Sequence, residues 1–317
     1  MAERSSWVGP GLLLVLATAL ISGVSTFVNA YAVQGTNSAA FVSIRNIVVA
    51  AAILPIALVA ARYLRAPRLA RADWLRLGVI GLIGGAIPFL LFFQGLQMAT
   101  AAGGAVTAAF AYRTLFLWAT VLAVFYLRER FDWRVVLGAG LLLGGSALLL
   151  SWNAPVWTDG TAYVLAATVM WAVEYTISKK ALGNLPSSTV MLGRMGFGGA
   201  FLAAYLALTA QWSAVAGFSG PEWTWVAISA AFLGVFVGTW YTGLKRVSLS
   251  VATSALVLGF PVTWLLGVLV QGHPISTEAS LGALAIVAGV AVVIGLSQFR
   301  EIGRFLARTL RPTAAST

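Results

Sequence analysis

The sequence has 317 residues, of which 60% are hydrophobic and only 9% are charged, and its mean hydropathy is +0.92. Soluble domains average about 25% charged residues, so this composition excludes a water-soluble globular protein and favours an integral membrane protein. The net charge of +11 does not indicate a nucleic-acid partner, because lysine and arginine also mark the cytoplasmic loops of membrane proteins.

Long apolar runs with few charges predict membrane helices, because the strands of a membrane barrel would alternate in short segments. Each run has about 18–24 residues, which is enough for a helix to cross about 30 Å of hydrocarbon. The ten predicted spans are residues 12–33, 38–61, 75–98, 104–127, 135–152, 161–178, 187–210, 223–244, 250–270 and 279–298.

The first span ends at Ala30-Tyr31-Ala32, which resembles a signal-peptidase site. The run is long for a signal peptide, and it has a counterpart in the second half of the chain. We therefore expect it to remain as a membrane helix.

Basic residues occur in every second predicted loop and at both ends of the chain. They occur before the first span, after the last, and in the loops after spans two, four, six and eight. The other five loops contain Asp159, Glu222 and Glu278 but no lysine or arginine. Because basic loops stay in the cytoplasm, the pattern predicts ten spans with both termini cytoplasmic. We expect the membrane to be a bacterial or archaeal cytoplasmic membrane.

The two halves of the chain share an internal repeat. The aligned pairs, at offsets of 144 to 149 residues, are Arg45 and Arg194, Trp74 and Trp223, Gly95 and Gly243, Gly138 and Gly282, and Gly145 and Gly289. Each repeat holds five spans, an odd number, so the second repeat must be inverted in the membrane. Inverted repeats are typical of secondary transporters. We predict a first five-helix repeat at 1–153, a second, inverted one at 154–300, and a basic cytoplasmic tail at 301–317.

Several motifs carry a resemblance to a known family. They are Thr161–Leu182 with its Trp171-Ala172, Thr100–Leu150 with its Leu127-Arg128-Glu129-Arg130, the arginines Arg45 and Arg194, and Pro261. On these residues, and over nearly its whole length, the chain resembles the EamA-type branch of the drug/metabolite transporter superfamily. The resemblance implies an all-α membrane fold of ten helices and a carrier of small metabolites. It leaves the substrate open, since the family moves amino acids, purines, drugs and other small metabolites.

The chain also departs from the family pattern. Phe116 stands where the family has a proline in span four, and the same span adds Arg113. Span one has Ser22-Gly23 in place of Trp-Ala, and the loop Gln271–Pro274 lacks an acidic residue.

Four charged residues lie well inside the predicted spans, whereas Arg76 lies at the cytoplasmic edge of span three. An intramembrane charge costs roughly 2.5–3.5 kcal/mol, so each must face protein or water. Arg45 and Arg194 are equivalent in the repeat, and we interpret them as structural buried charges. Arg113 and Glu174 have no charged counterparts, which favours a functional role. The alternative is a buried Arg113–Glu174 ion pair that only satisfies both charges.

A polar cavity near the middle of the membrane is expected around these charges, between the two repeats. The candidate substrate-binding residues are Arg113, Glu174, Trp171, Tyr175, Tyr112, Ser25, Asn29, Gln94, Trp240 and Tyr241. Arg113 would bind a carboxylate and Glu174 an amine, which suits a zwitterion such as an amino acid. If Arg113 and Glu174 neutralise each other, a cationic or neutral metabolite or drug fits equally well. Glu174 is also the candidate for proton coupling.

Enzymatic constellations are lacking in the sequence. The only histidine, His273, lies in a predicted external loop, so no histidine triad or zinc site can form, and cysteine is absent. No phosphate-binding glycine motif is present. We therefore expect no catalytic residue, no metal and no cofactor, and an exporter that works by alternating access. The alternative is a membrane receptor or scaffold that binds without carriage. The expected partners are a small-molecule substrate, the lipid bilayer and protons, and the sequence does not predict an oligomeric state.

Overall fold

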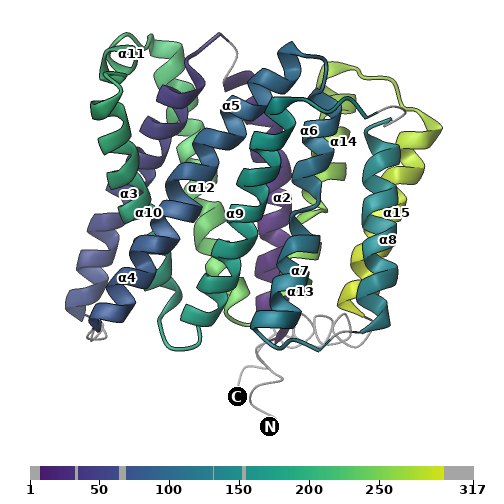
Figure 1. The fold of residues 1–317 in the computed structure, drawn as a ribbon, viewed down its shortest axis with the longest axis horizontal. Coiled ribbons are helices and arrows are strands. Elements are labelled where there is room, and N and C mark those ends of the chain that lie inside the picture. Colours follow the sequence, from purple (N-terminus) through teal and green to yellow (C-terminus); the bar gives the residue numbers. More distant parts are fainter. Residues whose placement is uncertain (1–7, 33–34, 64–68, 131, 152–154, 296–317) are drawn as a thin grey trace, which may run out of the picture.

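The computed structural model describes residues 8–32, 35–63, 69–130, 132–151 and 155–295, and these residues form an all-α bundle without strands (Figure 1). The helices of the first half are α2 (Val8–Ala32), α3 (Ser38–Tyr63), α4 (Arg71–Ile80), the π-helix η1 (Gly81–Ala86), α5 (Ile87–Ala101), α6 (Ala105–Arg113), α7 (Leu115–Tyr126) and α8 (Trp133–Leu149). Those of the second half are α9 (Asp159–Ala181), α10 (Ser187–Leu208), α11 (Trp212–Ala216), α12 (Gly220–Leu244), α13 (Leu249–Leu256), α14 (Gly259–Gln271) and α15 (Thr277–Ile294).

Eight helical segments within the described ranges are long and apolar enough to cross a membrane. They are Gly9–Ala32, Ser38–Pro55, Arg71–Ala101, Ala105–Tyr126, Ser187–Leu208, Gly220–Leu244, Leu249–Gln271 and Thr277–Ile294. The predicted spans five and six correspond to α8 and α9. The first is apolar but only 17 residues long, and the second has 23 residues with several charges. An integral membrane protein is therefore supported, and the count of ten spans stays a prediction.

Two of the predicted spans are broken near their middle. Span nine is divided into α13 and α14 just before Pro261, which has no N–H to donate to a preceding turn. Span four is divided after Arg113 without a proline. There the Thr114 hydroxyl donates to the Ala111 carbonyl at 2.6 Å and competes with the helical pattern. The break expected from the family proline is thus present although Phe116 replaces it.

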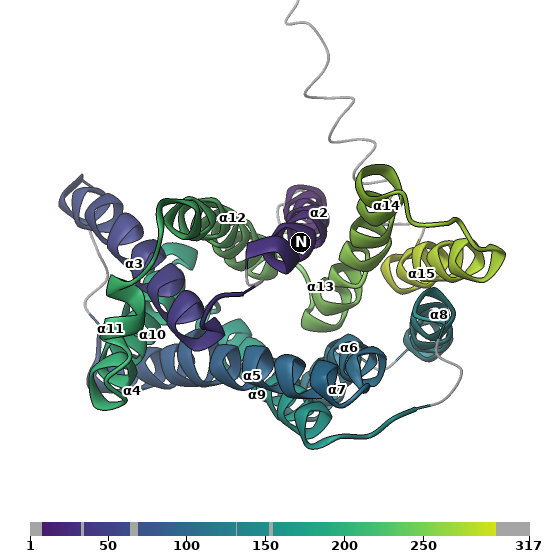
Figure 2. The ribbon, with the colours of Figure 1, turned by 90° about the horizontal axis from the view of Figure 1, so that it is seen from above.

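Glycine pairs bring α8 and α15 into direct contact at one edge of the bundle (Figure 2). A Cβ on Gly145 would lie 2.7 Å from the Gly282 carbonyl oxygen, and one on Gly138 would lie 3.0 Å from that of Gly289. The sequence repeat aligns Gly138 with Gly282 and Gly145 with Gly289. Exchanging the two halves therefore turns one of these contacts into the other.

The same relation holds at the centre of the bundle. Helix α5 crosses α9 where Gly95 meets Gly160, and α12 crosses α2 where Gly243 meets Gly11. Gly95 aligns with Gly243, and Gly11 with Gly160, at offsets of 148 and 149 residues. Equivalent helices in the two halves thus pack through equivalent glycines, which allow the close backbone approach that membrane helices use.

The bundle has two chemically distinct ends. One end, called the basic end below, carries Lys179 and Lys180 at the end of α9 and Lys245 after α12. The other end carries Asp159 and Glu222, in the first turns of the same two helices. The basic residues predicted in 64–68 and 296–317 lie outside the described residues.

Cysteine labelling tests the predicted orientation directly, because the natural chain has no cysteine. We expect a single cysteine at the exposed Arg130 to react with an impermeant thiol reagent only from the cytoplasm. Cysteines at Val156 and Ala216 should react only from outside. Reversal of any one of the three positions would contradict the ten-span topology.

Candidate functional site

A cavity of about 280 Å³ lies inside the bundle, and both halves of the chain contribute to its lining. Its charged residues are Arg45, Arg113 and Arg194. Its aromatic residues are Phe89, Phe92, Phe93, Tyr112, Trp171, Tyr175 and Phe236. Its neutral polar residues, all from α2, are Ser22, Ser25, Thr26 and Asn29, and the remaining lining residues are Ala30, Leu96, Ala108, Ala109 and Leu233.

The π-helix η1 and the proline that follows it shape one wall of this cavity. Pro88 has no N–H, so the carbonyl of Gly84, four residues earlier, lacks its usual helical donor. That carbonyl instead accepts hydrogen bonds from Trp171 Nε1 at 3.1 Å and from an Arg194 guanidinium nitrogen at 3.0 Å. The Asn46 side-chain amide donates to the Gly85 carbonyl at 3.0 Å. The local distortion thereby fixes two cavity residues, as π-bulges often do at functional sites.

Glu174 lies behind this wall and is fully buried. Its Oε1 accepts hydrogen bonds from Ser178 Oγ at 2.5 Å and Tyr241 OH at 2.6 Å, and its Oε2 lies 3.6 Å from Arg194 Nε. The side chain packs against Gly84, where a Cβ would collide with it. Glu174 therefore does not line the cavity, and its ionic partner is Arg194. The Arg113–Glu174 pair considered from the sequence is not formed in this structure.

Arg113 ends α6 at the break in the helix and faces the cavity. The centre of its guanidinium lies 3.5 Å from the ring centroid of Phe260 and 5.7 Å from that of Tyr112. Within the described ranges no residue forms a hydrogen bond or an ion pair with this guanidinium. Cation–π contacts with these two rings stabilise its charge, and its N–H groups stay available to a ligand.

Arg45 supplies a second guanidinium without a carboxylate. Its side chain donates twice to Asn46 Oδ1, at 3.1 and 3.0 Å, and lies over the rings of Phe89 and Phe93 at 5.0 and 5.7 Å. No acidic side chain in the described part of the chain lies within 4 Å of it. Arg45 and Arg194, which we interpreted as structural from the sequence, thus line the cavity together with Arg113.

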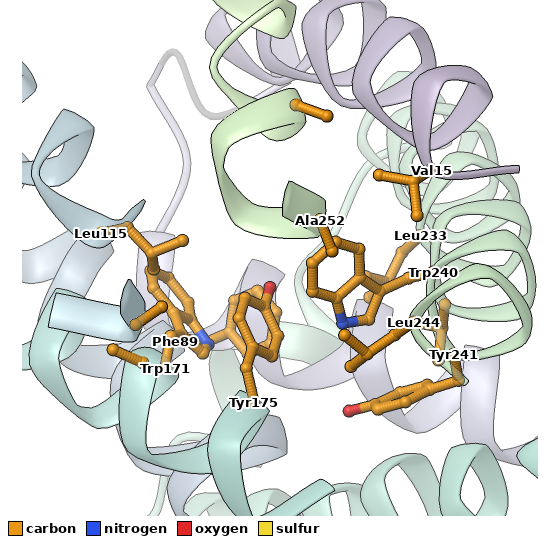
Figure 3. Packing of buried hydrophobic residues seen from close by; sticks show 14 of the residues in the cluster. Val15, Phe89, Leu115, Trp171, Tyr175, Leu233, Trp240, Tyr241, Leu244 and Ala252 are labelled. Atoms are coloured by element: carbon orange, nitrogen blue, oxygen red, sulfur yellow. The ribbon is translucent and has the colours of Figure 1, made fainter. Parts of the chain in front are cut away.

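The aromatic wall is centred on Trp171, and Figure 3 shows Phe89 beside it. The rings of Phe89, Phe92 and Tyr112 lie 5.3, 5.5 and 5.8 Å from it, mostly edge to face. Such geometry is favourable for aromatic pairs and forms a rigid apolar surface.

The polar wall is formed by α2 and is neutral. Asn29 donates to Ser25 Oγ at 3.3 Å and accepts from Ser229 Oγ of α12 at 2.6 Å. The hydroxyl and amide groups of this wall offer hydrogen bonds to a ligand without adding charge.

The structure brings together most, but not all, of the residues predicted from the sequence. Those that line the cavity are Arg113, Trp171, Tyr175, Tyr112, Ser25 and Asn29. Those outside its lining are Gln94, Glu174, Trp240 and Tyr241. Gln94 is exposed on α5. Trp240 is fully buried behind Tyr175, with ring centroids 4.6 Å apart (Figure 3). Tyr241 donates a hydrogen bond to Glu174 and does not line the cavity.

Sequence reasoning missed the phenylalanines of α5. Phe89, Phe92 and Phe93 stand at i, i+3 and i+4, so they share one helical face. That spacing was visible in the sequence, but aromatic residues on a membrane helix also face lipid or a neighbouring helix.

Comparisons with known proteins agree with this architecture. The sequence model of the EamA-like transporter family matches the chain twice, over residues 9–151 and 159–295. Among curated proteins no match was found. A solved structure described only as a crystal structure of a protein has a TM-score of 0.72 with this chain at 22% identity, and the match covers 89% of this chain and 96% of the other. That likeness shows the fold alone. The two family matches span nearly the whole sequence and confirm the resemblance seen in its motifs, so the chain belongs to the EamA-like transporter family.

Proposed function

We propose that this protein is a secondary transporter that exports a small metabolite by alternating access around the cavity. The observation that carries the proposal is a cavity of about 280 Å³ lined by helices from both halves of the chain. Substrate sites at the interface of two inverted repeats are typical of secondary transporters. We further propose that the repeats are the five-helix units 1–153 and 154–300 and that 301–317 is a cytoplasmic tail.

Closure of the basic end supports a state open toward the opposite side. Lys179 Nζ donates to the carbonyls of Leu244 and Val247, at 2.7 and 2.5 Å. The Glu129 carboxylate accepts from the backbone N–H groups of Leu249 and Ser250, at 2.6 and 3.2 Å, at the N-terminus of α13. The first two bonds join the end of α9 to the end of α12 and the loop after it, and the other two join the segment after α7 to the start of α13.

The cavity itself lies toward the other end. Its lining on α2 comes from residues 22–30, near the end of that helix, and its lining on α6 from residues 108–113. With the basic end placed in the cytoplasm, this conformation is outward-facing.

Counterflow in liposomes tests the proposal against a receptor or scaffold. A thermal-shift screen of carboxylates, amino acids, nucleobases and quaternary amines first identifies a ligand. We expect liposomes preloaded with that ligand to accumulate the labelled form transiently, because only a carrier exchanges solutes across the bilayer. Binding without accumulation would favour the receptor alternative, and equilibration without overshoot would indicate a channel.

A further inference from the structure

The cavity carries an excess of positive charge. Three guanidinium groups line it, from Arg45, Arg113 and Arg194, and the only carboxylate within 4 Å of any of them in the described part of the chain is that of Glu174. That carboxylate is buried outside the lining and is engaged by Arg194, Ser178 and Tyr241. Uncompensated charges inside a membrane protein are costly, and they persist where they serve a pathway or a ligand.

We infer that the substrate is an organic carboxylate without an amine, carried on a planar or otherwise apolar body; this rests on the proposed transport function. A carboxylate would compensate the charge that Arg113 and Arg45 leave open. An ammonium group would be repelled in this cavity, because the lining presents guanidinium groups and no carboxylate. The zwitterion considered from the sequence required Glu174 at the cavity, and its place is taken here by a neutral polar wall.

The orientation of the Arg113 guanidinium suits a carboxylate ligand. Its guanidinium lies close to the ring of Phe260, so one face is covered while the N–H groups remain without protein partners. A guanidinium held in this way offers two parallel N–H donors to a carboxylate, and such bidentate pairs are among the stronger polar interactions in proteins. Arg45, held by Asn46 and the phenylalanines, adds a second fixed positive charge.

The rest of the lining defines the body of the substrate. Trp171 and the rings around it form an apolar surface that an aromatic or aliphatic body can contact. The volume of about 280 Å³ is at the lower end for small-molecule sites, which favours a body of about one ring. An inorganic anion such as phosphate would leave the aromatic wall without a function.

A matched series of four probes tests the inference by binding alone. The probes are 3-phenylpropionate, phenylalanine, phenethylamine and 3-phenylpropanamide. All four have a phenyl ring, and they carry, in this order, a carboxylate, a carboxylate with an ammonium group, an ammonium group alone and no charged group. Isothermal titration of the purified full-length protein in nanodiscs should give a dissociation constant for phenylpropionate at least about tenfold lower than for the other three, as expected for a charged hydrogen bond.

Variants then locate the effect. Arg113→Gln should reduce the preference for the carboxylate over the amide to about twofold or less, and Arg134→Gln, on the exposed side of α8, should leave it unchanged. Equal or tighter binding of phenylalanine or phenethylamine would overturn the inference, as would binding of none of the four. Competition by inorganic phosphate at similar concentration would also overturn it, by revealing a simple anion site.

The outcome is separable from that of the proposed function. If phenylpropionate binds selectively but liposomes show no counterflow, the transport proposal fails while the site assignment stands. If liposomes exchange phenylalanine or phenethylamine with equal efficiency, transport stands and the carboxylate assignment fails.

Discussion

Replacing Glu174 with alanine is expected to lower the free energy of unfolding by about 3–5 kcal/mol, the usual cost of removing one partner of a buried ion pair. The Glu174 side chain is 0% exposed and that of Arg194 is 2% exposed. The variant leaves the Arg194 guanidinium in the bundle without a carboxylate. It also removes the acceptor of the hydrogen bonds from Ser178 and Tyr241. Reversible denaturation in mixed micelles measures the difference.

A double-mutant cycle with Arg194→Met separates the pair from its surroundings. We expect the double variant Glu174→Ala/Arg194→Met to cost less than the sum of the single variants, because no unpaired charge remains. Glu278→Ala, at an exposed site in the first turn of α15, serves as the control and should change stability by less than about 0.5 kcal/mol. Additive effects, or a loss below about 1 kcal/mol for Glu174→Ala, would show that the pair does not stabilise the bundle.

The same carboxylate stays our candidate for proton coupling, since it is the only acidic side chain within the predicted spans. Glu174→Gln keeps the shape of the side chain and removes its titration. If Glu174 couples transport to protons, this variant loses uptake driven by a pH gradient but keeps some exchange. Wild-type dependence on the gradient would leave the residue with a structural role only.

Gly145→Leu is expected to be the most damaging substitution outside the cavity. A Cβ at this position would lie 2.7 Å from the Gly282 carbonyl oxygen and 3.0 Å from the Ile286 backbone nitrogen. Backbone atoms cannot rotate away as side chains do, so α8 and α15 would have to separate. Overpacking typically costs 1–3 kcal/mol, and we expect about 3 kcal/mol or more here, seen as loss of monodisperse protein after extraction.

Gly144 provides the matched control, one residue away on the same helix. It is exposed, and a Cβ there would meet nothing within 4 Å. Gly144→Leu should therefore extract and denature like the natural protein. If Gly144→Leu and Gly145→Leu were equally harmful, or equally harmless, the close contact between α8 and α15 would be disproved.

The helices and their repeat were predictable because hydrophobic runs and basic loops can be recognised from the order of residues along the chain. The glycine alignment went further, since Gly138 and Gly145 align with the same glycines that they meet, in exchanged order. The break after Arg113 was obscured, because the family proline is missing and a threonine hydroxyl replaces its effect.

The partner of Glu174 could not be predicted in the same way. Helical periodicity places Glu174 on a face of α9, but it does not say whether α6 with Arg113 or α10 with Arg194 lies opposite that face. That choice depends on the distortion at Gly84 and Pro88, which directs Arg194 toward α9. Pro88 was visible in the sequence, but the groups that use the freed carbonyl come from 87 and 110 residues away.

Accessibility of the cavity from both sides of the membrane is the most direct test of the proposed transport by alternating access. Ser25 lines the cavity on α2, and Ser25→Cys adds a single thiol to a chain that has none. In oriented vesicles, alternating access predicts that impermeant thiol reagents reach this cysteine from either side, and that trapping the outward-facing state blocks the reaction from the cytoplasm. Reaction from one side only, under all conditions and with every bound ligand, would contradict a carrier and leave a membrane receptor as the better account.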